Sequence, residues 1–168
     1  MTLEQTPEQF QEARTFGANA QLRTVRLAKS KSWSRRLSEE LGENVESEIT
    51  IAYTDPAPSQ GEITLPVQLN FRMVEKQDDT QSEIIGIEAE FEADYALRPG
   101  YEATKSQVAA FHMSNAVHNC WPFFREFVQS LSVRMGYPAP PVPLLRLAIK
   151  PVQARSARRV PPTKKKLA

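Results

Sequence analysis

Two histidines and the single cysteine lie close together in the second half of the chain, at His112, His118 and Cys120. These residue types could bind a metal ion or support nucleophilic catalysis. Their separations of six and two residues do not give the i, i+4 pair that a metal site on a helix uses. The sequence also has no glycine-rich phosphate loop, nucleophile elbow or Ser-His-Asp order. We therefore predict no catalytic residue, no metal and no cofactor, and interpret the three residues as side chains in or near a helix joint.

Acidic side chains recur at every second position in two segments of the chain. Alternation with apolar residues predicts strands with one buried face and one exposed face. The acidic residues of the exposed face would be Glu46, Glu48, Glu88, Glu90, Glu92 and Asp94. This face is either a solvated surface that protects the sheet from aggregation or a docking surface for a basic partner. Arg26 and Arg72 would share the face and neutralise part of its charge.

Four segments have the pattern of strands: Leu22–Ala28, Val45–Tyr53, Ile63–Met73 and Ile85–Leu97. Pro66 lies inside the third, where it weakens the expected ladder. A long connection follows the first strand, and short turns link the other three. This order favours an antiparallel Greek-key sheet in which the first strand lies beside the fourth. Helices must cover the apolar face, so the predicted class is α+β.

The connection Lys29–Asn44 is rich in serine and basic residues. Within it, Trp33, Leu37 and Leu41 are four residues apart, the spacing of one helical face, so a helix is possible over Ser34–Leu41. These three side chains either form a lid on the core or border a groove that binds another polypeptide.

Two helices are predicted outside the sheet. The run Thr6-Pro7-Glu8-Gln9 has the pattern of a capping box, and the short helix it begins continues to about Phe16, where Gly17 ends it. Tyr101–His118 is the second, and it leads into a joint at Trp121 and Pro122.

A third helix is predicted over Pro122–Met135, with Asn119 able to cap it and Gly136 at its end. Its side chains have more aromatic surface than one sheet can cover, so we expect it to pack on its own sheet and on another subunit. The residues of this oligomer helix are Trp121, Phe123, Phe124, Phe127, Val128 and Leu131.

The 168 residues suffice for one domain, and no apolar run approaches the length of a membrane span. We expect no signal peptide and, with one cysteine, a reducing cytoplasm. Lys150–Lys166 holds seven basic residues and no acidic one, which leaves 14 basic against 20 acidic residues before it. The predicted organisation is a helical extension (1–19), a domain (20–149) and a disordered basic tail (150–168). The tail is a solubilising segment or a partner of the acidic face. We do not predict nucleic acid as its ligand, because no aromatic or folded platform accompanies the charges.

The run WPFFREFVQSLSVRMGYPAPPVPLL resembles the C-terminal signature of the SecB export-chaperone family, an aromatic-Pro-x-x-Arg-Glu helix followed by a glycine and a proline-rich exit. Ala20–Ser30 is similar to the family's first strand and Gly86–Leu97 to its last. The resemblance implies an ATP-independent holdase, which binds unfolded polypeptides in hydrophobic grooves. It also implies a homotetramer built as a dimer of dimers, a groove bordered by Trp33, Leu37 and Leu41, and an acidic face that docks the protein-translocation motor.

Family members devoted to export carry an amphipathic helix after the proline-rich exit, whereas LLRLAIKPVQARSARRV has no helical stripe. The groove is then more open, or bounded by this segment in extended form. In this respect the chain resembles the toxin–antitoxin branch of the family, in which the client is an antitoxin. Its N-terminal helix and basic tail support the same resemblance. The sequence leaves export and antitoxin control open. The alternative is an adaptor or scaffold that binds one folded protein.

Overall fold

A four-stranded antiparallel sheet forms one layer of the protein. The computed structural model describes residues 1–35, 44–53, 61–77 and 80–150. The strands are β2 (Ala20–Ser34), β3 (Val45–Tyr53), β4 (Glu62–Gln77) and β5 (Thr80–Leu97), in the order β2-β5-β4-β3. The first strand of the sheet therefore lies beside the fourth, which confirms the predicted Greek-key arrangement.

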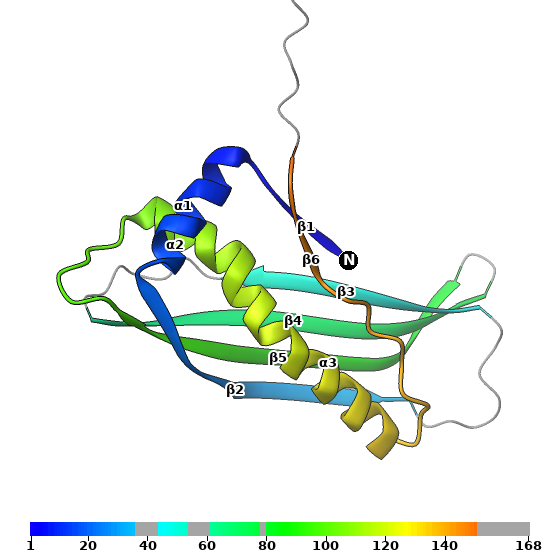
Figure 1. Ribbon diagram of the computed structural model, residues 1–168. Helices are drawn as coiled ribbons and strands as arrows, with labels where there is room; N and C mark the ends of the chain where they lie inside the picture. The colour runs from blue at the N-terminus through cyan, green and yellow to red at the C-terminus, as the bar shows by residue number, and fades with distance from the viewer. Residues whose placement is uncertain (36–43, 54–60, 78–79, 151–168) are drawn as a thin grey trace, which may run out of the picture.

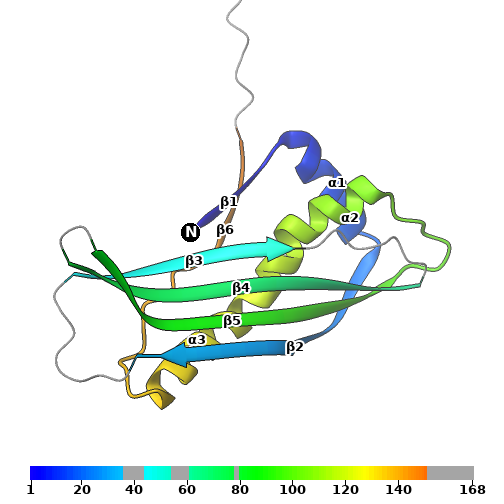
Figure 2. The same ribbon diagram turned by 180° about the vertical axis from the view of Figure 1, so that it is seen from behind.

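Helices form the second layer, on one face of the sheet only (Figure 1). They are α1 (Pro7–Gly17), α2 (Lys105–Phe111), a π-helical turn η1 (His112–Ala116) and α3 (Val117–Arg134). The long helix α3 crosses β5 and β4 diagonally, and no helix of the described residues lies on the opposite face of the sheet (Figure 2). The predicted α+β class is confirmed. Among the described residues, no helix is long and apolar enough to span a membrane.

Period-two alternation in β4 and β5 produces the core. Every second side chain of these central strands faces the helices and is buried, from Leu65 to Phe71 and from Ile87 to Leu97. Phe124 and Val128 of α3 meet them from above and are fully buried. Each large apolar side chain removed from water in this way stabilises the fold by about 1.5–3 kcal/mol. The sheet and α3 thus share one hydrophobic core, which also includes residues of α1 and α2.

The first strand is longer than predicted, since β2 continues through Lys29–Ser34 instead of ending at Ala28. Register with β5 is kept over this segment, from Lys29 opposite Glu90 to Ser34 opposite Ile85. Cross-strand pairing outweighs the weak local preference of a Ser- and Lys-rich sequence. The prediction of a connection with a possible helix was wrong for these residues. Leu37 and Leu41 lie outside the described residues.

The helical region is also more continuous than predicted. α2 begins after a capping box of Thr104 and Gln107, not at Tyr101, and leads through η1 directly into α3. Asn119 does not cap a new helix; its amide donates to the Tyr95 hydroxyl at 2.8 Å. Pro122 lies inside α3 on an exposed side, where water can satisfy the carbonyl left without a helical donor. The predicted joint at Trp121 and Pro122 was therefore wrong, whereas Gly136, with φ 88°, ends the helical region as expected.

Pro66 is accommodated in β4 because the described part of β3 ends one residue short of it. The last residue pair between these strands joins Tyr53 to Val67, so among the described residues Pro66 has a strand partner only on the β5 side. The Pro66 carbonyl is bonded instead to Nε2 of His112, at 2.7 Å. The main-chain nitrogen and oxygen of one strand residue point to the same edge, so the missing N–H costs no ladder bond. His112 takes the place that a longer β3 would fill.

A two-stranded parallel ribbon was not predicted. It pairs β1 (Thr2–Gln5) with β6 (Arg146–Ile149) and lies on the helix side, beyond the β3 edge (Figure 1). The capping box of Thr6 and Gln9 then begins α1, as predicted. The segment after the proline-rich exit is thus extended rather than helical. Apart from Lys150, the basic tail falls outside the described residues.

Candidate functional site

The outer face of the sheet carries all six acidic residues that we proposed as a docking surface. Four of the six lie in cross-strand ion pairs: Arg26 with Glu92 and, at 3.8 Å, with Asp94, Lys29 with Glu90 at 3.2 Å, and Lys76 with Glu46 at 2.6 Å. Arg72 of the same face pairs with Glu83 at 3.5 Å. Asp94 accepts from the Thr64 hydroxyl and Glu48 from the Gln81 amide. The face is therefore largely charge-compensated by side chains of its own strands.

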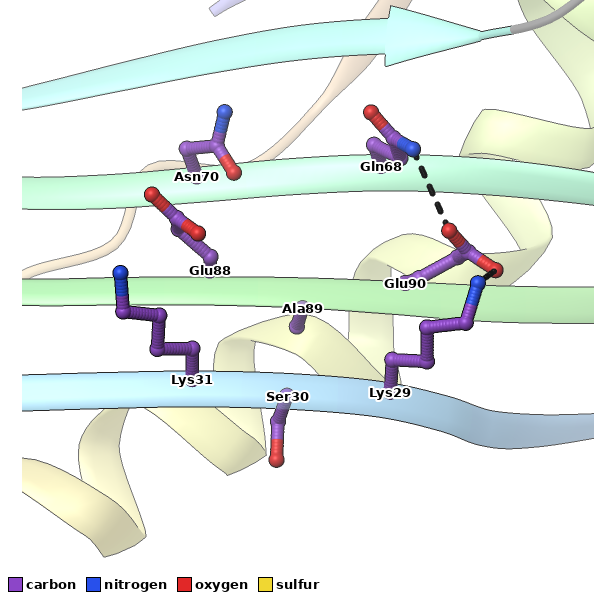
Figure 3. Close-up of a pocket in the computed structure, with 8 residues that line it drawn as sticks. All are labelled: Lys29, Ser30, Lys31, Gln68, Asn70, Glu88, Ala89 and Glu90. Carbon is purple, nitrogen blue, oxygen red and sulfur yellow. Dashed lines mark hydrogen bonds and ion pairs between the residues drawn. The ribbon is translucent and has the colours of Figure 1, made fainter.

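A shallow hollow of about 350 Å³ lies in this face between β2 and β4 (Figure 3). Glu90 lies between Gln68 and Lys29 and accepts from both at 3.2 Å, and these two bonds lower the pKa of its carboxyl. Glu88 lies between Lys31 and Asn70. Paired charges of this kind provide polar contacts to a partner, yet they contain no nucleophile or isolated acid–base group.

Trp33 lies on this outer face, not in a seam beside the core where we predicted a groove. It is directly opposite Gly86 in the register of β2 and β5. Its indole N–H donates to Glu83, and the Lys31 ammonium lies 5.1 Å from the ring centre. The ring is half-buried, so the outer face has one large aromatic surface among its charges. Leu37 and Leu41 lie outside the described residues.

The residues of the oligomer helix divide into two groups. Trp121, Phe124 and Val128 are buried within the chain, and Leu131 is half-buried. Phe127 packs edge-on against Phe91, with ring centres 6.3 Å apart. By contrast, Phe123 is 49% exposed. Phe123 is thus the aromatic residue of α3 that is most available to a second molecule.

The pattern Trp-Pro-x-x-Arg has a direct structural role in this chain. Trp121 donates its indole N–H to the Pro143 carbonyl, and Arg125 donates Nε–H to the Val142 carbonyl, both at 3.0 Å. Val142 and Leu145 are buried by this attachment. Helix α3 therefore holds the proline-rich segment along its side and brings β6 back to the N-terminus.

Apolar side chains that sequence reasoning missed remain exposed on the helix side of β2. Leu22 faces the same side as Tyr95, and Leu27 the same side as Phe91, but they are 41% and 42% exposed. The alternation of these leucines with polar residues can be seen in the sequence. The path of α3 cannot, and this path leaves the β2 edge of the sheet partly uncovered. Exposed apolar surface at a sheet edge is typical of an interaction site.

The three residues with possible chemistry are not brought together. His112 is buried and bonded to Pro66, and His118 is exposed on α3. Cys120 is fully buried, and burial raises the pKa of its thiol to about 12. In the described part of the chain, no group of three or more His, Cys, Asp or Glu residues could hold a metal ion. These three residues therefore form no common site.

No protein-family model and no curated protein matches the sequence. A similar solved structure is that of the SecB-like chaperone Rv1957 of Mycobacterium tuberculosis, in complex with a ChAD peptide from the Rv1956 HigA1 antitoxin. The match has a TM-score of 0.69 at 17% sequence identity and covers 82% of this chain and 99% of that one. A protein of unknown function from Streptococcus agalactiae matches with a TM-score of 0.39 at 9% identity, over 74% of this chain and 97% of that one. The chain has the fold of a SecB-like chaperone.

Proposed function

We propose that the protein is an ATP-independent chaperone that binds unfolded or extended polypeptide and holds it without catalysing a reaction. The observation that carries the proposal is the combination of this fold with apolar side chains that the helix layer leaves exposed, above all Leu22 and Leu27. The similar Mycobacterium tuberculosis protein is a chaperone in complex with an antitoxin peptide. An antitoxin is accordingly one candidate client, and an unfolded protein destined for export is the other.

Leu22 and Leu27 suit a client because they lie on the helix-facing side of an edge strand. An extended segment could place alternate side chains against them and add its backbone to the free edge of β2. Trp33, with Leu37 and Leu41, remains a second candidate contact. Because β2 carries Trp33 on the opposite face of the sheet, the two candidates can be tested independently.

We also propose assembly into a tetramer through α3. Phe123 and Val133 are 49% and 56% exposed on this helix, and a second subunit would remove them from water. Several client surfaces on one assembly would raise the avidity for a long unfolded chain. Binding of the protein-translocation motor is less favoured, since four of the six acidic side chains of the outer face already have cationic partners.

The test is an aggregation assay with a chemically denatured client. A ligand of the unfolded state slows folding and aggregation in proportion to its free concentration over its dissociation constant. A several-fold excess of the protein should therefore suppress light scattering without ATP. Unchanged scattering, together with recovery of one native protein in pull-downs, would favour a folded-partner adaptor instead.

A further inference from the structure

Three of the ten large apolar side chains that are exposed in the described residues surround one cavity. The cavity, of about 200 Å³, lies between α1, η1 and β6. Phe10 of α1 is 41% exposed, and Leu147 and Ile149 of β6 are 40% and 48% exposed. Apolar side chains gathered around a hollow, unlike scattered ones, form a candidate interaction site. The volume suffices for one leucine- or phenylalanine-sized side chain.

Two hydrogen-bond donors border the same cavity. Arg14 lies one turn after Phe10 on α1, and its guanidinium makes no ion pair within the described residues. Asn115 of η1 accepts from the Ser114 hydroxyl at 3.0 Å through Oδ1, which leaves its Nδ2 as a donor. No acidic side chain of the described residues lines the cavity. A ligand that complements this border carries a negative charge beside an apolar group.

The β6 strand offers a backbone edge next to the cavity. Arg146 donates its N–H to the Met1 carbonyl at 3.1 Å, and Lys150 donates to the Gln5 carbonyl at 2.8 Å. In a parallel pair, alternate residues face the partner strand, so the main-chain groups of Leu147 and Ile149 face away from β1. No other described strand pairs with β6. An extended peptide could therefore bind along this edge.

The position of the cavity is fixed by the N-terminal segment. Gln5 is buried and donates Nε2–H to the Ala110 carbonyl at 3.1 Å. Phe16 packs on Phe111 with ring centres 4.6 Å apart, which holds α1 against α2. The apolar side chains around the cavity therefore stay exposed although the elements that carry them are firmly packed.

We propose that this cavity is a second polypeptide-binding site, which takes an extended segment with an apolar side chain followed two residues later by an acidic one. In an extended chain, these two side chains lie on the same face. The apolar group fills the space bordered by Phe10, Leu147 and Ile149, and the carboxylate pairs with Arg14. The proposal depends on the proposed function only in taking polypeptide as the ligand class.

The probe is a fluorescently labelled nonapeptide with a central leucine and a glutamate two residues later, measured by anisotropy with the full-length protein. A peptide with lysine in place of glutamate should bind about fivefold more weakly, the upper range for an exposed ion pair. Arg14→Gln should remove this preference, and Arg14→Lys should retain most of it. Arg98→Gln, at an exposed arginine after β5, is the matched control and should change nothing.

Ile149→Asp should lower the affinity for both peptides by at least about tenfold, because it places a charge where the bound peptide would bury apolar surface. Equal binding of the two peptides, or an unchanged preference in Arg14→Gln, would overturn the proposal. A change of molar mass in Ile149→Asp by light scattering would also overturn it, since a second copy of the chain would then occupy the cavity. Aggregation assays on the same variants separate the outcomes: normal holdase activity with no peptide preference refutes only this site.

Discussion

The indole of Trp33 lies over Gly86, the residue directly opposite it on the neighbouring strand. A Cβ atom at position 86 would overlap Cζ2 and Cε2 of the indole. Glycine is thus required at this position by the close approach of an aromatic ring, not by a turn. The pair fixes the register of β2 and β5 at the end of β2, immediately before residues 36–43.

Gly86→Ala should destabilise the protein by about 1–3 kcal/mol, the usual cost of forcing extra volume into a filled site. The reason is displacement of Trp33, so the same substitution should cost less than about 0.5 kcal/mol in a Trp33→Ala background. Urea unfolding of the two single variants and the double variant measures the coupling. Equal costs in both backgrounds would show that the indole does not occupy this position in solution.

Phe123→Asp should dissociate the proposed tetramer while leaving the fold intact. Phe123 is 49% exposed, so a charge there costs little within one chain and much in an apolar interface. Light scattering measures the molar mass, and circular dichroism checks the fold. Phe127→Asp is a less clean test because Phe127 also packs on Phe91. A wild-type protein that is monomeric at micromolar concentration would contradict the assembly.

The strands and the Greek-key order were predictable because alternation in Val45–Tyr53, Ile63–Met73 and Ile85–Leu97 reports burial directly. The end of the first strand was not, because Lys29–Ser34 is held in the sheet by partners on β5 that are 51 to 61 residues away in sequence. The spacing of Trp33 with two leucines gave a helical signal, but Trp33 itself pairs with Gly86 in the sheet, and the two leucines lie outside the described residues.

The site was predictable only in part. The acidic face follows from alternation, but its compensation by Lys29 and Lys76 depends on which strands are neighbours. The cavity beside β6 depends on pairing between the first and last described segments. Alternation of Leu145, Leu147 and Ile149 could have indicated β6, whereas the four residues of β1 carry no usable pattern.

Cys120 should make stability fall at alkaline pH. Burial raises the pKa of its thiol to about 12, above the value of about 8.5 in an unfolded chain. The neutral thiol therefore stabilises the fold fully below about pH 8.5, and this contribution is lost by about 1.4 kcal/mol per pH unit as the pH rises towards 12. Burial also raises the pKa of Tyr95, which acts in the same direction at higher pH.

Urea unfolding at pH 7 and pH 10 of the wild type and Cys120→Ala isolates the effect of the thiol. The wild type should lose about 2 kcal/mol more than the variant over this interval, because only the wild type must ionise a thiol on unfolding. Identical losses would mean that Cys120 reaches solvent in the folded protein.

The most direct test of a polypeptide-binding function is the affinity for a permanently unfolded client, compared between the wild type and Leu22→Ser/Leu27→Ser. Both leucines are about two-fifths exposed, so the double substitution should leave the fold intact. Isothermal titration calorimetry measures the affinity, and light scattering confirms an unchanged molar mass. We predict that the wild type binds the unfolded client without ATP and that the double variant binds it about tenfold more weakly. No binding by the wild type would contradict the proposed chaperone function, and equal binding by the variant would place the client elsewhere than on the β2 edge.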